Sequence, residues 1–361
     1  MQIPEKQGQA AFTEEERALL LGYLMQLRAD FISRFLERAD LPRTGTRAVL
    51  RERVEEALSE GRVTYESIAL FLDEFERWGK QHVVLYANPG GYRDQWASEE
   101  EVRARLREHE LEQLLDAPLP VALPEMMTLS SISFAPGTRL VVTAVERREQ
   151  VKRREDLDPK DGLEPDEAGG STIRRIELRA FERVITRGLV VFDWQIDAGT
   201  AAIHISQRPT GQRYDTVIAD FAGLVDPWLR LDRFAPLDLA DAVAALHAHE
   251  EEDPDTAETR SHRHAYRTTE NRELQISSAS AQQSAFGETA LDQVASTVRN
   301  RGVAQLGNLF FLAVEHPSDE RPLVDDVHVT ILVADSRVNF MTPQSPDAIS
   351  YVLGRLRALS G

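Results

Sequence analysis

Hydrophobic residues recur every three or four positions through most of the first 117 residues, the spacing of helices that bury one face. Thr13 and Glu16 have the spacing of a capping box and predict the start of the first helix. A later helix is expected to run from the cap residue Thr46 to about Ser59, with Gly61 as its stop. The caps of two further predicted helices are Thr64 and Ser98. We therefore predict an all-helical domain over residues 1–117.

The pattern changes after a linker marked by Pro118, Pro120 and Pro124. Alternating and continuous apolar runs predict strands at 138–145, 189–196, 201–205, 309–314 and 327–333, and the turn at 197–200 predicts a hairpin. Helices are expected at 238–247, 288–300 and 346–359. Two polar segments, 147–170 and 248–273, are predicted to be exposed loops. Residues 118–361 are thus an expected α+β domain with antiparallel strands, built from two similar halves at 125–250 and 285–361.

Charge and composition narrow the classes of protein. The net charge of −18 argues against a surface coated in nucleic acid, although screening lets a local basic patch act alone. The absence of cysteine excludes disulfides and thiolate chemistry. The N-terminus has no apolar signal segment, and no run approaches the length of a membrane span. We expect a soluble, cytoplasmic protein, nucleoid-associated if the source is bacterial.

Residues 28–54 are locally basic, with seven arginines against four acids and a balance of +3. Two short amphipathic helices are predicted here, joined by the turn LPRTGTR at 41–47. Backbone N–H groups at the start of a helix, flanked by basic residues, are a ready site for phosphate. Gly45 supplies the backbone freedom of the turn, and Arg51 follows Arg47 by one helical turn.

This segment, 28–58, resembles the SAP module, a small helix-extended-helix unit that binds DNA. The resemblance implies that the turn and the start of the second helix lie against the duplex. The matching positions, with Arg51 one helical turn beyond them, are Arg43, Thr44, Gly45, Thr46 and Arg47. Asp40 departs from the pattern, because such modules usually carry glycine there. The alternative is a helical hairpin that only packs, with its arginines in solvent.

The order of elements over the whole chain is similar to that of centromere protein N and its relatives. The similarity rests on a predicted helix over 231–243 and on the run VNFMTP at 338–343, which leads into Tyr351, Val352 and Leu353. It implies a helical N-terminal domain joined to an α+β domain, with DNA held in a basic groove. No defined motif carries it, and no functional residue is transferred from it.

A second basic tract places an arginine at every fourth position from 175 to 187. On a helix this spacing gives one cationic stripe, whose members are Arg175, Arg179, Arg183 and Arg187. The stripe is either a solvated face or the wall of a nucleic-acid groove. It has no interleaved aromatic residues, so stacking of single-stranded bases is not indicated.

Signals for catalysis or for a metal are weak. His247, His249, His262 and His264 cluster around acids, but in a polar segment and without a metal-binding motif. Phosphate-loop, nucleophile-elbow and dinucleotide motifs are missing. Asp193, Asp197 and Asp220 are conceivable nuclease carboxylates, yet they lack the strand-associated lysine of restriction-type nucleases. We predict no catalytic residue, metal or cofactor, and a divergent metal-dependent nuclease is the least unlikely enzyme class.

The sequence therefore predicts a non-enzymatic protein that binds DNA phosphates with little sequence preference. No predicted recognition helix carries the side chains that read base edges. The alternative is a protein–protein adaptor subunit of a larger complex, for example one that processes DNA. A protein partner is expected in addition to DNA, and a membrane is not.

Overall fold

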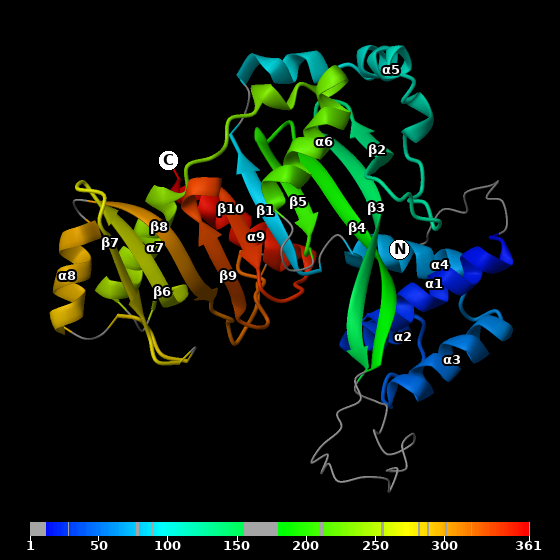
Figure 1. The fold of residues 1–361 in the computed structure, drawn as a ribbon, viewed down its shortest axis with the longest axis horizontal. Coiled ribbons are helices and arrows are strands. Elements are labelled where there is room, and N and C mark those ends of the chain that lie inside the picture. The colour runs from blue at the N-terminus through cyan, green and yellow to red at the C-terminus, as the bar shows by residue number, and fades with distance from the viewer. Residues whose placement is uncertain are drawn as a thin grey trace, which may run out of the picture.

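The computed structural model describes residues 12–27, 29–76, 79–87, 90–154, 180–208, 213–253, 256–280, 282–286, 289–299, 302–318 and 320–360. Within these residues the chain forms a unit of helices and, beside it, one ten-stranded sheet (Figure 1). In the described part of the chain, no helix combines the length and apolar character needed to cross a membrane.

The helical unit precedes the sheet and has a core of its own. Its helices are α1 (Glu14–Gln26), α2 (Ala29–Arg38), α3 (Arg47–Ser59) and α4 (Tyr65–Glu76). Phe35 and Phe71 meet edge to face with their ring centroids 5.1 Å apart, which joins α2 to α4. Val121, from the proline-rich linker at residues 118–124, packs into the same core.

The sheet is antiparallel throughout, in the strand order β2-β3-β4-β5-β1-β10-β9-β8-β6-β7. Strand β1 pairs with β5 on one side and with β10 on the other, so it joins two groups of strands. The strands are β1 (Gln81–Tyr86), β2 (Thr128–Ala135), β3 (Arg139–Arg154), β4 (Ala180–Gln195), β5 (Thr200–Ser206), β6 (Thr259–Thr268), β7 (Glu273–Ser277), β8 (Gly302–Phe311), β9 (Val327–Leu332) and β10 (Arg337–Phe340).

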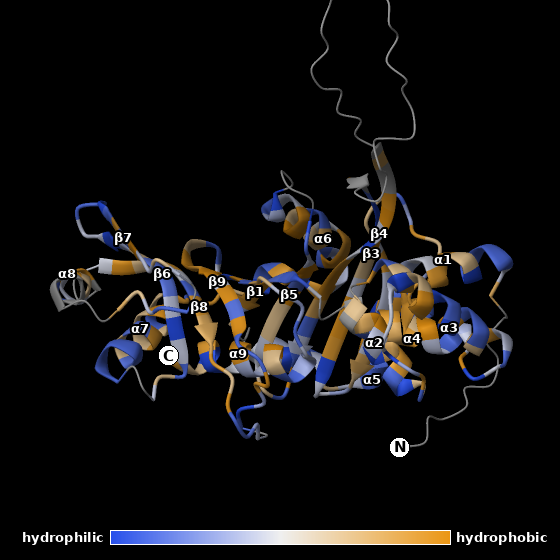
Figure 2. Cartoon of the chain, turned by 90° about the horizontal axis from the view of Figure 1, so that it is seen from below, coloured by the Kyte–Doolittle hydropathy of each residue, from blue (hydrophilic) through white to orange (hydrophobic). Residues whose placement is uncertain are grey.

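The helices that follow β1 cover different faces of the two strand groups. They are α5 (Glu99–Glu108), α6 (Tyr214–Leu229), α7 (Ala240–Glu252), α8 (Thr289–Arg299) and α9 (Pro346–Leu359). Helix α6 packs on β3, β4 and β5, whereas α7 and α9 pack on β1, β8, β9 and β10 from the opposite face (Figure 2). Strand β5 takes part in both cores: Ile203 faces α6, while its neighbour Ala202 belongs to the core beneath α9, because successive strand residues point to opposite faces.

The α+β class with antiparallel strands is confirmed, and so are the local signals that start helices. Thr13 and Glu16 form the predicted capping box, and Thr46 and Ser98 accept hydrogen bonds from the backbone of the helices that they cap. The last helix has the predicted bounds, 346–359. The hairpin at 197–200 joins β4 to β5, with Gln195 paired to Thr200.

The prediction that residues 1–117 are all-helical holds only in part, because Gln81–Tyr86 forms a central strand of the sheet. The predicted loop at 147–170 is wrong for its first part, where β3 continues to Arg154, and its remainder lies outside the described residues. The predicted loop at 248–273 is wrong as well. That segment holds the end of α7 and all of β6, in which Ala265 and Tyr266 are buried.

The helix predicted around Arg183 and Arg187 is also wrong, because both residues lie in β4. Arg175 and Arg179, the other members of the predicted stripe, lie outside the described residues. A spacing of four does not distinguish the two structures, since residues four apart share a face on a strand as they do on a helix.

Candidate nucleic-acid interface

The first candidate site is the turn between α2 and α3, which forms as the sequence predicts. Thr46 caps α3, accepting a long hydrogen bond of 3.5 Å from the N–H of Val49. Gly45 has φ +150°, and a Cβ at this position would lie 2.9 Å from Cγ1 of Val49. Glycine is therefore required both by the backbone conformation and by the close approach of the helix.

Two arginines of this turn form exposed ion pairs. Arg43 lies 2.5 Å from Glu37, and Arg51 lies 2.8 Å from Glu55 one helical turn away. All four side chains are about half exposed. Exposed pairs of this kind contribute only about 0–1 kcal/mol, so either arginine can exchange its carboxylate for another anion at little cost.

Arg47 is exposed but has a different role, because its guanidinium binds the backbone of another helix of the unit. It donates to the carbonyl oxygens of Met25 at 2.9 Å and Leu27 at 3.0 Å, at the end of α1. The last carbonyls of a helix have no partner within the helix, and a guanidinium satisfies them while opposing the negative end of the dipole. Arg47 thus fixes α1 to the start of α3.

The second candidate site is a projecting ribbon, here called the arm, made of residues 146–154 of β3 and 180–188 of β4. These residues pair with each other, whereas β2 and β5 pair with β3 and β4 only nearer the core. The arm leaves the sheet beside the helical unit (Figures 1 and 2). It carries seven basic and three acidic residues, a balance of +4 in a chain of −18.

The outer part of the arm also exposes apolar side chains. Val151 is 70% exposed and Phe181 is 62% exposed, on opposite strands and two register positions apart. Arg183 lies directly opposite Val151. The basic tracts at 147–154 and 183–187, which are separate in the sequence, are therefore brought together on one ribbon.

The inner end of the arm is fastened to the helical unit by Arg187. Its side chain is 1% exposed and its guanidinium lies 2.9 Å from the carboxylate of Asp73 on α4. Removing one partner of a buried ion pair leaves an uncompensated charge in the interior, which lowers the stability of the fold by several kcal/mol. Arg187, predicted to contact phosphate, is therefore a structural anchor in this fold.

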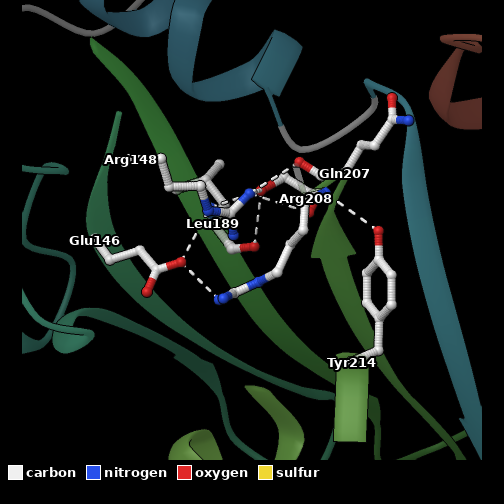
Figure 3. Close-up of polar contacts among 7 residues, drawn as sticks. Glu146, Arg148, Leu189, Gln207, Arg208 and Tyr214 are labelled. Atoms are coloured by element: carbon white, nitrogen blue, oxygen red, sulfur yellow. Dashed lines mark hydrogen bonds and ion pairs between the residues drawn. The ribbon is translucent and has the colours of Figure 1, made fainter. Parts of the chain in front are cut away.

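On the other side of the arm base, Arg148 joins the ribbon to the end of β5 (Figure 3). Its Nε donates to Glu146 at 2.8 Å, and its Nη1 donates to the carbonyls of Ser206 at 3.2 Å and Gln207 at 3.0 Å. Arg208 lies 2.5 Å from the same carboxylate of Glu146. Two guanidiniums thus contact one carboxylate whose side chain is 15% exposed, at the root of the arm.

Gly188 makes this arrangement sterically feasible. A Cβ there would lie 2.2 Å from Nε of Arg148, so the guanidinium passes directly over the glycine. Arg148 and Gly188 were not among the predicted site residues. An isolated glycine within a strand pattern is the signal that could have found them, because it marks a place where another group approaches closely.

The base of the arm continues into a stack of rings. The hydroxyl of Tyr214 accepts a hydrogen bond from the N–H of Arg208 at 3.1 Å, and its ring lies 3.7 Å from that of His82. The guanidinium carbon of Arg337 lies over the Tyr214 ring, 5.2 Å from its centroid. Burial and the nearby Arg337 lower the pKa of His82 to about 4, so this histidine is neutral near pH 7.

Two histidines of the predicted cluster, and one of the predicted aspartates, take structural positions. His247 and His264 are buried with ring centroids 4.9 Å apart, and Nδ1 of His247 contacts the Tyr266 hydroxyl at 2.5 Å. Asp193 is held by both nitrogens of the Arg139 fork, at 2.9 and 2.6 Å. Among the residues that the structure describes, no group of three or more His, Asp or Glu is arranged to hold a metal ion.

Comparison of the sequence with protein-family models and with curated proteins finds no match to either.

Proposed function

We propose that this protein binds DNA through the phosphate backbone, with the arm as the principal contact and the α2–α3 turn as a second one. The observation that carries the proposal is the basic composition of the arm, which has five basic residues besides the buried anchors Arg148 and Arg187 and projects from a chain of −18. Such a concentration of one sign on a projecting element steers a polyanion to that element. The acidic remainder of the chain repels DNA from other surfaces.

The shape of the arm agrees with this proposal. The major groove of DNA admits a two-stranded ribbon as well as a helix, and ribbon proteins use either groove. Phosphate contacts by arginine and lysine position a protein without reading sequence. We therefore propose binding with little sequence preference, in which exposed Val151 and Phe181 lie against the sugar and base edges of the groove.

The turn contributes through the arginines that are not committed to the fold. Arg43 and Arg51 are half exposed and paired with surface carboxylates, so they can turn to phosphates. Arg47 keeps α3 in place by its bonds to the end of α1. The turn lies in the helical unit to which Arg187 fastens the base of the arm.

The test measures binding of the full chain to a labelled 30-base-pair duplex over a series of salt concentrations. One triple variant neutralises the arm (Lys152→Gln, Arg153→Gln, Arg154→Gln), and a double variant neutralises the turn (Arg43→Gln, Arg51→Gln). Each phosphate contact contributes about 0.9 to the slope of log affinity against log salt. We expect the slope to fall by about 2–3 in the arm variant and by about 1–2 in the turn variant.

A matched control removes three arginines far from the arm in the sequence (Arg103→Gln, Arg107→Gln, Arg272→Gln), all of them exposed. It should keep the slope of the wild type. Absence of salt-sensitive binding, or an equal loss in the control and in the arm variant, would contradict the proposal.

A protein–protein adaptor is the second candidate function, and a groove in the helical unit favours it. The groove, of about 470 Å³, lies between α2 and α4 and is lined by Phe35, Ala39, Val63, Leu70 and Phe71. Leu70 is 61% exposed at its rim. Loss of a copurifying protein in Leu70→Glu, with duplex binding unchanged, would favour the adaptor.

A further inference from the structure

A cavity of about 440 Å³ lies between α9 and the strands β3, β4 and β5, on the face of the sheet opposite α6. Strand residues form one wall, among them Arg139, Asp193 and His204, and α9 forms the other. Arg139, which lines the cavity, is the first residue of β3, and the arm is formed by the opposite end of that strand. The cavity is therefore separate from the proposed DNA contact.

Arg357 gives the cavity an unbalanced positive charge. Its Nη2 donates to the carbonyl of Ala201 at 3.2 Å, but its buried Nε has no hydrogen-bond partner among the described residues. The acid whose charge acts on Arg357 is Asp193. Its carboxylate already accepts hydrogen bonds from the Arg139 guanidinium and, at 3.0 Å, from Nε2 of Gln195. Burial lowers the pKa of Arg357, although Asp193 counteracts this. A desolvated cation without a carboxylate of its own is stabilised by any anion that can reach it.

A second buried donor lies beside the cavity wall. His204 lines the cavity, and its Nδ1 lies 2.9 Å from Oε1 of Gln81. Gln81 is 2% exposed, and its Nε2 has no hydrogen-bond partner among the described residues. Buried polar groups normally find a partner, and the Arg357 Nε, which belongs to a residue that lines the cavity, has none among the described residues.

The α9 wall is apolar. Pro346, Ile349 and Leu353 line it, and Ser350 is the exposed polar residue of the helix at this wall. Binding sites for small molecules generally combine apolar walls with a few polar groups that fix orientation. The volume also lies in the range of such sites, about 300–1,000 Å³.

We propose that this cavity binds a small organic anion, an acid group on an apolar body, with the acid group on Arg357 and the body against Ile349 and Leu353. Carboxylates and phosphate monoesters share the required chemistry, because a guanidinium binds either through two parallel hydrogen bonds. The proposal does not depend on DNA binding.

The test follows the thermal unfolding midpoint of the full chain at constant ionic strength, with chloride as the reference salt. The probes are benzoate and phenyl phosphate, which carry an apolar ring, and acetate and inorganic phosphate, which do not. We expect the ring-bearing probe with the correct acid group to raise the midpoint by about 2–4 °C in a saturable way. The probe without the ring should raise it less, and the stronger of the two ring-bearing probes identifies the acid group.

Two variants assign the effect to the cavity. Arg357→Gln removes the cation, and Ser350→Trp fills the cavity from an exposed position on α9 without touching the core. Both should lose the shift, while Arg272→Gln, which is 82% exposed and distant in the sequence, should keep it. If Arg357→Gln fails to fold, Ser350→Trp decides alone.

The proposal is overturned if no probe raises the midpoint above chloride, or if Ser350→Trp keeps the full shift. Duplex affinity should be unchanged in Ser350→Trp. The arm variant should weaken duplex binding and keep the probe-induced shift, whereas loss of duplex binding in Ser350→Trp would place the cavity on the DNA path and would also overturn the proposal.

Discussion

The turn between α2 and α3 and the base of the arm are both rich in arginine, yet they use it differently. In the turn, Arg43 and Arg51 form half-exposed pairs with neighbouring glutamates. At the base of the arm, Arg187 and Arg148 have side chains that are 1% and 5% exposed, and they hold separate elements together. The group that each guanidinium binds, and not the number of arginines, therefore decides whether its charge joins elements of the fold or only pairs at the surface.

The comparison also shows that neighbouring arginines can differ in role. Arg47 and Arg51 are one turn apart on α3, but Arg47 binds the carbonyls that end α1, whereas Arg51 pairs only with Glu55 of its own helix among the described residues. A guanidinium bound to backbone of another element contributes to tertiary structure. One that pairs along its own helix contributes little to stability.

The largest expected effect is that of removing the anchor of the arm. Arg187→Met leaves the Asp73 carboxylate without this guanidinium, and we expect the free energy of unfolding to fall by about 3–5 kcal/mol. Urea unfolding followed by circular dichroism measures it. A loss below about 1 kcal/mol would mean that the base of the arm is as tolerant as the turn, and the contrast would be lost.

A smaller but substantial loss is expected for Gly188→Ala, because the added Cβ would lie 2.2 Å from Nε of Arg148. We expect the free energy of unfolding to fall by about 1–3 kcal/mol, the usual range for overpacking. Gly91→Ala is the control without a clash, since Gly91, like Gly188, is outside the positive-φ region and has no atom within 4 Å of an added Cβ. In the double variant Gly188→Ala, Arg148→Ala the two losses should be less than additive; strict additivity would argue against the contact.

The ring stack at the base of the arm predicts a dependence on pH. The pKa of His82 is lowered to about 4 from an unfolded value near 6.5, so the unfolded state takes up the proton first as the pH falls. The stability contributed by neutral His82 is present above pH 6.5 and is lost as the pH falls towards 4. We expect wild type to lose about 1–2 kcal/mol more than His82→Asn between pH 7 and 4.5, a fraction of the full linkage value because the ring is only partly buried.

Urea midpoints of the two proteins at pH 7 and 4.5 measure this difference. Equal losses in wild type and variant would mean that His82 is solvated and that the base of the arm is not desolvated.

The smallest expected effects separate the two arginines of α3. Arg47→Ala should lower the free energy of unfolding by about 1 kcal/mol, because two carbonyls at the end of α1 lose a charged donor. Arg51→Ala should change it by less than about 0.5 kcal/mol, the value of an exposed pair within a helix. Thermal unfolding of both variants under the same conditions tests the pair, and equal losses would contradict the distinction.

The sequence predicted those features whose causes are local. The starts of α1, α3 and α5 follow from Thr13, Thr46 and Ser98, because a cap is determined by residues within one helical turn. The hairpin between β4 and β5 was found for the same reason. The α+β class then follows from the sum of these elements.

Features fixed by distant partners were not predicted. Strand β1 is short, and its neighbours β5 and β10 lie far along the chain, so no local pattern distinguishes it from the end of a helical region. The arm was missed because its basic residues read as a loop and a helix, whereas strand pairing joins them. Of the candidate site, the turn was predicted from its sequence, but the buried pair of Arg187 with Asp73 depends on tertiary packing.

The central position of β1 has a consequence for how the chain folds during synthesis. Its residues, 81–86, leave the ribosome early, but the strands on its two sides are residues 200–206 and 337–340. The helical unit has its own core and can form first, whereas β1 must wait with both backbone edges unpaired until β5 exists, and with one edge unpaired until almost the whole chain has been made. Pairings over such long separations are slow to form, so closure of the sheet around β1 should set the folding rate.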